Sequence, residues 1–201
     1  TTIDSMSVIS NGKQVIVNTN DTPYPLGNES ANKIKKKYDN IDLLLLGYSS
    51  ANSYPQCFQL SKNEINSGKS KVIKKFLDYA ESYISLFKPK FYFPFAGRYV
   101  LGGKNFELNE NTANISADDA VEYLNSSKNI PEFSKSVRLN SNCSFDIDTG
   151  ISNEEYVPLD KKQQQEYCRE ILSNQKYDYE YEEEPTFEKF TEIIPECIQN
   201  F

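Results

Sequence analysis

No histidine occurs in this chain of 201 residues, which removes the side chain used most often for metal binding and for general base catalysis near neutral pH. A zinc hydrolase site, or a serine or cysteine nucleophile paired with histidine, would therefore be incomplete within this chain. The sequence also shows no glycine-rich phosphate loop, no Gly-x-Ser-x-Gly motif and no internal repeat. These absences exclude the common nucleotide-binding and serine hydrolase signatures.

Long apolar runs and paired cysteine motifs are also missing. No run approaches the roughly twenty apolar residues that span a bilayer, and the first residues, Thr-Thr-Ile-Asp, are unlike a signal peptide. The formal net charge is −7 without a clustered basic face, so we expect neither nucleic acid nor a membrane as partner. The cysteines lie far apart, which favours reduced thiols and a cytoplasmic location. They are Cys57, Cys143, Cys168 and Cys197.

The first 103 residues read as a layered α/β unit. Asn11-Gly12 separates two β-branched runs and predicts a hairpin of residues 7–10 and 14–17. Residues 28–39 and 62–87 have helical periodicity, and between them Asp42 to Gly47 is an unbroken apolar run typical of a strand covered on both faces. Strand, helix, strand, helix and strand then follow one another, which favours crossover units in a layered sheet.

The run Lys88 to Leu101 ends this unit in a way that suits a binding site. Phe91 to Phe93 and Tyr99 to Leu101 are predicted strands, and Pro94, which lacks an N–H, should end the first strand or mark a sheet edge. Small residues at 96 and 97 allow a close backbone approach, and Arg98 adds a fork of donors beside it. The alternative is a buried strand end followed by a solvated arginine.

Residues 104–201 are more polar and are predicted to form a mainly helical extension packed on the first unit. We expect a loop or lid over 104–116, a helix from the capping box of Ser116 and Asp119 to Ser126, and two short strands at 137–139 and 144–147. A helix over 160–173, an acidic linker over 177–184 and a final helix capped by Thr186 complete this extension.

The residues after the predicted hairpin carry the clearest candidate for chemistry. Polar groups at the carboxyl end of a buried strand are where α/β folds place their sites, and Asp21 could there bind zinc or a hard metal, with Asn18 or Asn20 orienting it. The alternative is a turn that caps a helix beginning near Asn28. The polar loop that begins at Tyr48 could line the same pocket or be a solvated connection.

Four segments together resemble one family. They are Asn-Thr-Asn-Asp-Thr at 18–22, Asp-Leu-Leu-Leu-Leu-Gly-Tyr-Ser at 42–49, Tyr-Pro-Gln-Cys at 54–57 and Lys-Pro-Lys-Phe-Tyr-Phe-Pro-Phe-Ala-Gly at 88–97. The later Leu-Asn-Ser-Asn-Cys-Ser-Phe-Asp-Ile segment at 139–147 is also similar. The chain resembles the second half of metallo-β-lactamase-fold proteins related to CMP-N-acetylneuraminate hydroxylase, followed by a C-terminal extension.

The resemblance implies half of an αββα sandwich, with residues 1–103 as the C-terminal half of the α/β domain and 104–201 as the extension. It implies that Asp21 matches a metal-ligand aspartate and that the histidine-rich ligand motif lies in a first half that this chain lacks. The final histidine ligand of many relatives should fall near Pro94 to Gly97, where this sequence has none. Arg98, Tyr99 and Tyr48 are the candidate substrate-binding residues. Asn18, Asn20 and Gly97 are the candidate supports of the site.

The implied function is a piece of a metal-dependent hydrolase or sugar-modifying enzyme. Its cofactor would be zinc, iron or manganese in the full-length parent, and we expect this chain alone to bind none and to be inactive, since catalytic zinc takes about three protein ligands. Its partners would be the missing N-terminal half and a small-molecule substrate. The alternative is a non-catalytic binding or scaffold module that keeps the fold without the metal site.

Overall fold

The computed structural model describes residues 5–177 and 181, and a five-stranded sheet with the order β1-β2-β3-β4-β5 lies at its centre. β1 pairs with β2 in the antiparallel sense, and each later strand pairs with its neighbour in the parallel sense. The fold is therefore mixed α/β with a mainly parallel sheet. The strands are β1 (Ser7–Ser10), β2 (Val15–Asn18), β3 (Leu43–Gly47), β4 (Phe91–Ala96) and β5 (Lys135–Ser136).

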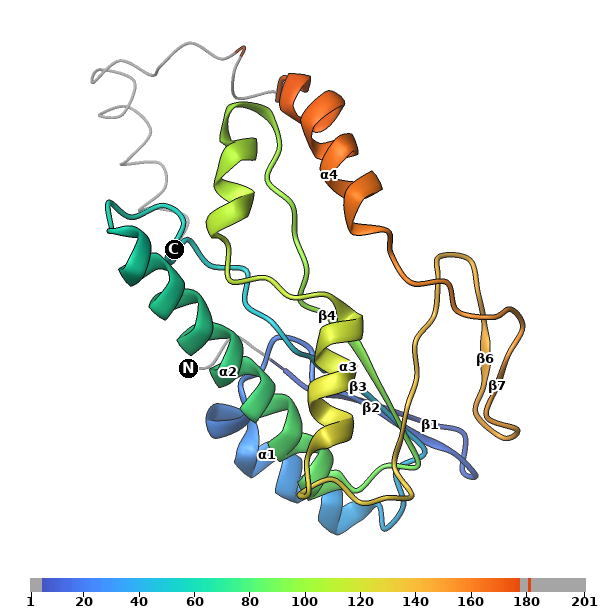
Figure 1. Ribbon diagram of the computed structural model, residues 1–201. Coiled ribbons are helices and arrows are strands. Elements are labelled where there is room, and N and C mark those ends of the chain that lie inside the picture. Colours follow the sequence, from blue (N-terminus) through green and yellow to red (C-terminus); the bar gives the residue numbers. More distant parts are fainter. Residues whose placement is uncertain (1–4, 178–180, 182–201) are drawn as a thin grey trace, which may run out of the picture.

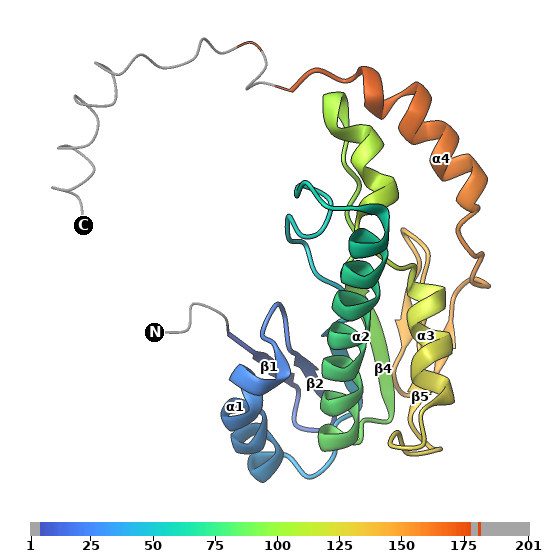
Figure 2. The ribbon, with the colours of Figure 1, turned by 60° about the vertical axis from the view of Figure 1, so that its left-hand side comes forward.

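Three helices cover one face of this sheet. Figures 1 and 2 show α1 (Tyr24–Lys37), α2 (Lys62–Phe87) and α3 (Ala117–Ser126) side by side in a single layer. Because successive parallel strands are neighbours and their crossovers share one hand, all connecting helices fall on the same side. The core between the layers includes the fully buried Val17, Leu44, Leu46, Tyr92 and Phe87.

The local signals for the hairpin and for α2 are confirmed. Gly12 has a φ of 85° in the β1–β2 turn, a conformation that glycine adopts without strain. α2 begins at a capping box in which Ser61 and Glu64 exchange hydrogen bonds, and it ends at Lys88 in the left-handed conformation just before Pro89. These caps explain why the bounds of α2 match the predicted 62–87.

α1 begins four residues earlier than the predicted 28–39, at Tyr24. Pro25 lies in the first turn, where the missing N–H would have no helical partner in any case. Gly27 is buried because α1 crosses α2 closely there, and a Cβ on Gly27 would lie 2.2 Å from the Tyr83 hydroxyl oxygen. Residues that suggested a loop therefore belong to a helix fixed by tertiary packing.

β4 continues through Pro94 to Ala96. Residues 99–101 form no strand, so the prediction of a second strand at Tyr99 to Leu101 is wrong. The amide of Phe91 donates to Asp42 of the β3 side, so alternation along β4 points the nitrogen of Pro94 toward β5. β5 pairs only with Phe91 and Tyr92, and no strand within residues 5–177 lies beside Pro94 on that side. The prediction of a sheet edge at Pro94 is thus confirmed.

The remaining elements differ more from prediction. Residues 103–111 form a 3₁₀ helix, η1 (Gly103–Asn111), where a loop was expected. β6 (Phe145–Asp146) pairs with β7 (Ile151–Ser152), and residues 137–139 are not a strand. α4 (Lys161–Glu170), capped by Asp160, and η2 (Leu172–Asn174) replace the predicted single helix at 160–173. The predicted final helix, and the acidic linker apart from Tyr177 and Tyr181, lie outside the described residues.

The face of the sheet opposite the helices is apolar and only partly covered by described residues. Phe91 points to this face and contacts Phe145 of β6, with 5.0 Å between ring centroids. Ile9 is 63% exposed and Phe95 is 42% exposed. Ile16, Leu43, Leu45 and Phe93 share the face by register and alternation, and all four are half-buried. The expectation that β3 is covered on both faces is met only in part by the described residues.

Candidate functional site

The carboxyl ends of β2, β3 and β4 meet along one edge of the sheet, where α/β folds usually bind ligands. A cavity of about 320 Å³ lies there between the loops after β2 and β3 and the side of α2. Its walls include Asn20, Asp21, Ser49 and Ser50. Gly97, after β4, touches the same wall, since a Cβ on Gly97 would lie 2.8 Å from the backbone nitrogen of Ser49. The structure thus places Asp21 and the end of β4 with Gly97 along the same edge.

The alternative of a turn that caps α1 is met only in part, because the turn is present but no side chain caps the helix. The N-cap of α1 is Pro23, which has no side-chain capping bond, and Asp21 is exposed. Its carboxylate makes no hydrogen bond or ion pair with any residue of the described ranges. An unpaired carboxylate at the carboxyl edge of a parallel sheet is free to bind a cation or a donor group.

The two asparagines before Asp21 shape its turn rather than orient its carboxylate. The side-chain oxygen of Asn18 accepts a hydrogen bond of 2.8 Å from the amide of Asn20, which has a φ of 48°. An asparagine tolerates this left-handed conformation better than most residues do. After the turn, the Tyr83 hydroxyl donates a 3.0 Å hydrogen bond to the carbonyl of Thr22. α2 therefore fixes the position of the loop that carries Asp21.

The residues around Asp21 do not complete a metal site. Within residues 5–177, no group of three or more His, Cys, Asp or Glu side chains lies close enough to hold a metal ion. The described residues of the cavity wall include no second acid and no cysteine. Because catalytic zinc takes about three protein ligands, the described part of the chain supplies at most one of them here.

The candidate substrate-binding residues divide into two groups. Tyr99 has its hydroxyl engaged, since it donates to the carbonyl of Asn52 at 3.1 Å and accepts from the Gln56 amide at 2.8 Å. Arg98 is exposed and donates a short hydrogen bond to the side-chain oxygen of Gln164 on α4. The partner of Arg98 in the extension is thus a neutral amide and not an acid. Tyr99 supports a loop, while Arg98 keeps an uncompensated charge.

Tyr48 lies near Arg98 and away from the Asp21 cavity. Its ring is 4% exposed, and burial raises the pKa of the Tyr48 hydroxyl, an effect that the positive charge of Arg98 opposes. The negative charges of Asp118 and Asp119 of α3 also raise the pKa of the Tyr48 hydroxyl. The structure therefore groups Tyr48 with Arg98 and the start of α3, and neither Tyr48 nor Arg98 lines the Asp21 cavity.

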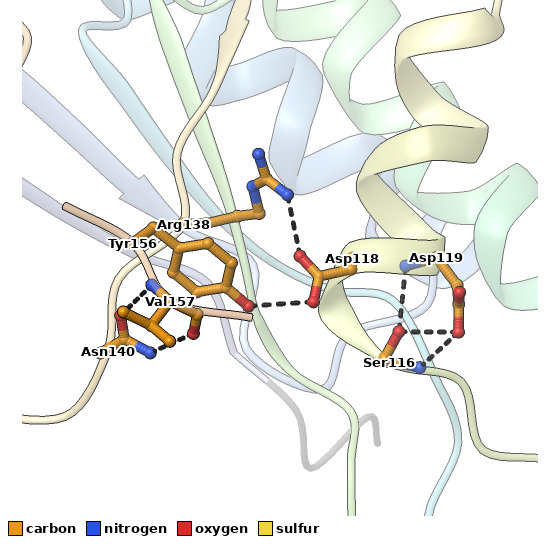
Figure 3. Close-up of polar contacts among 7 residues, drawn as sticks. All are labelled: Ser116, Asp118, Asp119, Arg138, Asn140, Tyr156 and Val157. Atoms are coloured by element: carbon orange, nitrogen blue, oxygen red, sulfur yellow. Dashed lines mark hydrogen bonds and ion pairs between the residues drawn. The ribbon is translucent and has the colours of Figure 1, made fainter. Parts of the chain in front are cut away.

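Figure 3 shows a polar cluster at the start of α3 that the sequence reasoning missed. Asp118 accepts hydrogen bonds from the Arg138 guanidinium at 2.8 Å and from the Tyr156 hydroxyl at 3.1 Å. The Arg138 guanidinium also lies 4.9 Å from the centre of the Tyr156 ring. These bonds fasten the segment before α4 to the carboxyl end of β5. The sequence indicated that two acids open α3, but it contained no pattern that predicts the contact of Arg138 and Tyr156 with Asp118.

The same region holds a cavity of about 750 Å³ whose wall includes Arg98, Asp118, Arg138 and Lys161. Asp119 takes part in the capping box, and its hydrogen bond from the Ser116 hydroxyl lowers the pKa of that carboxyl. Arg138 pairs with Asp118 and Lys161 pairs with Asp119. Arg98 is therefore the basic residue of this wall that has no carboxylate partner in the described ranges. The carboxyl edge thus has an acidic end at Asp21 and a cationic end at Arg98.

Comparisons with known proteins do not extend this description. Neither the family models, the curated proteins nor the solved structures contain a significant match to this chain. In the described ranges, none of the helices combines the length and the apolar character that crossing a membrane requires.

Proposed function

We propose that this chain is one half of a metallo-β-lactamase-like αββα sandwich and acts as part of a metal-dependent hydrolase or sugar-modifying enzyme. In a full-length parent, a missing N-terminal half would complete the sandwich and bring the other metal ligands. This chain would contribute Asp21 and the residues that hold an anionic substrate group, and it would be inactive by itself.

The partly covered face of the sheet carries this proposal. A parallel sheet normally has both faces covered, and its strands are apolar throughout for that reason. Here Leu43 and Leu45 alternate with the fully buried Leu44 and Leu46, yet they remain half-buried on a face that also exposes Ile9 and Phe95. A second sheet packed on that face would bury these side chains, which is the arrangement of a four-layer sandwich.

The state of Asp21 supports the same proposal. Its carboxylate is unpaired, exposed and placed at the carboxyl edge, as expected of a ligand that another segment completes. Zinc, iron or manganese, when bound, supplies an activated water and polarises a substrate oxygen. The role of this chain is to hold one carboxylate in place through the Asn18 turn and the Tyr83 hydrogen bond.

The test is the metal content of the full-length parent protein, purified without chelators. We expect stoichiometric zinc, iron or manganese in the wild type and a clear loss in Asp21→Asn. Asp39→Asn is a matched control, because Asp39 is an exposed acid just after α1 and is not part of the wall of the Asp21 cavity. A parent without metal, or equal metal in Asp21→Asn and the wild type, would overturn the proposal.

The second candidate is a binding or scaffold module that keeps the fold without metal chemistry. It is favoured by the absence, within residues 5–177, of a three-residue cluster of possible metal ligands. A parent protein that is metal-free but still binds a small molecule or protein at the carboxyl edge would establish it.

A further inference from the structure

A cavity of about 810 Å³ lies between the chain that follows β4 and helix α4. Two predicted substrate-binding residues, Arg98 and Tyr99, both line it, and Tyr48 does not. Its volume is within the range of small-molecule sites in proteins. Apolar side chains, Val100, Phe106 and Leu108, form part of its wall, so it is neither wholly polar nor wholly apolar.

Positive charge exceeds negative charge in this cavity, although the whole chain has a net charge of −7. The basic wall residues are Lys69, Arg98, Lys161 and Arg169, and the acidic ones are Glu107 and Glu110. The Arg98 guanidinium bonds only the neutral amide of Gln164, and the Arg169 guanidinium has no partner in the described ranges. Because guanidinium stays protonated at any physiological pH, the cavity holds two positive charges without a paired carboxylate.

One residue of the cavity wall, Asn114, has a buried acceptor without a donor. The side-chain amide nitrogen of Asn114 donates a 2.8 Å hydrogen bond to the carbonyl of Tyr99, which fixes the orientation of the amide. Its oxygen is buried and has no hydrogen-bond partner among the described residues. A buried acceptor that lacks a donor costs free energy, and a ligand hydroxyl would satisfy it.

We propose that this cavity binds a small phosphate ester that carries a hydroxyl group. The Arg98 and Arg169 guanidinium groups would hold the phosphate oxygens in charge-assisted hydrogen bonds, and the Asn114 oxygen would accept from the hydroxyl. Since Arg98 follows β4 and Arg169 belongs to α4, the ligand would tie α4 to the sheet. The inference rests on the anion-binding role that the proposed function gives to Arg98, but it does not depend on a metal.

The test is calorimetric titration of this chain with glycerol 3-phosphate, which has both groups, and with inorganic phosphate and glycerol, which each have one. We expect saturable binding of glycerol 3-phosphate, weaker binding of phosphate and none of glycerol. Arg98→Gln and Arg169→Gln should each weaken the affinity about tenfold or more, the usual effect of losing a charged hydrogen bond. Lys162→Gln should change it less than twofold, because Lys162 is on α4 but outside the cavity wall and pairs with Glu166.

Circular dichroism of each variant shows whether α4 and the sheet remain folded. No saturable binding of glycerol 3-phosphate at millimolar concentration would overturn the proposal, as would an equal loss in Lys162→Gln and Arg169→Gln. Binding that Asn114→Ala leaves unchanged for glycerol 3-phosphate would refute the hydroxyl contact. The result is separable from the metal test, because the titration uses this chain without metal and the metal test depends on Asp21.

Discussion

Removing the Tyr83 hydroxyl tests whether α2 holds the loop that carries Asp21. In Tyr83→Phe the 3.0 Å hydrogen bond to the Thr22 carbonyl is lost, while the ring contacts with Tyr24 and Phe87 remain. The hydrogen bond is buried, because Tyr83 is 2% exposed. The carbonyl would be left without a partner in a site closed to water, which costs about 1–3 kcal/mol.

The stability of the variant is measured by urea unfolding at neutral pH. Thermal unfolding is a second measurement, and for a chain of this size we expect the melting temperature to fall by about 2–4 °C for each kcal/mol lost. Tyr79→Phe is the matched control, since Tyr79 also lines the Asp21 cavity from α2 but has no hydrogen bond to the Asp21 loop. A loss below about 0.5 kcal/mol in Tyr83→Phe, or an equal loss in the control, would show that this bond does not hold the loop.

The same substitution has a signature at alkaline pH. Burial raises the pKa of Tyr83 well above its ordinary value, so the folded protein keeps the hydroxyl neutral where the unfolded chain ionises near pH 10. The raised pKa means that the contribution of Tyr83 is complete below pH 10 and is lost as pH rises toward the folded-state pKa. Between about pH 10 and 11, the wild type should lose about 1 kcal/mol more than Tyr83→Phe.

Four further substitutions test the packing around the sheet and the cap of α3. Gly27→Ala should lower the free energy of unfolding by about 1–3 kcal/mol, because the new Cβ would lie 2.2 Å from the Tyr83 hydroxyl oxygen. In a double-mutant cycle, Gly27→Ala combined with Tyr83→Phe should cost less than the sum of the two single losses. In this chain alone, Leu46→Ala should cost about 2–5 kcal/mol and Leu45→Ala only about 1 kcal/mol, because of the two only Leu46 is fully buried. Equal losses by urea unfolding would contradict the partly covered face. Ser116→Ala should cost about 0.5–2 kcal/mol by loss of the α3 cap. The hydrogen bond from Ser116 lowers the pKa of Asp119, so this contribution is present above about pH 4 and lost as pH falls, and the variant should show a shallower acid unfolding curve than the wild type.

Local signals predicted the elements that depend on few neighbours. The Asn11-Gly12 turn, the Ser116 capping box and the apolar stripe of α2 each involve residues within a few positions of one another, and each is confirmed. The start of α1 was missed because Gly27 favours a loop in isolation. Its helical conformation is stabilised by contact with Tyr83, a residue more than fifty positions away.

The candidate site follows the same division. Asp21 and residues 94–97 lie along one edge, as expected, because parallel strands end at the same side of a sheet, although residues 94–96 belong to β4 and do not form a turn. The partners of Asp118 could not be predicted, since Arg138 and Tyr156 approach it through long loops without a periodic pattern. The pairing of β6 with β7 was missed because each strand has two residues, too few to show alternation.

The two incomplete features of the molecule point in one direction. A carboxylate without a partner at a sheet edge is not unusual by itself, and a half-covered apolar face has several explanations. The two features lie next to each other in the fold, because Leu45 of the half-covered face and Asn18 of the Asp21 turn are paired in the sheet register. A second layer placed on Leu45 would therefore extend beside the turn that carries Asp21. One added segment could then bury the face and supply ligands to the carboxylate, which is why the metal content of the proposed full-length parent is the decisive measurement.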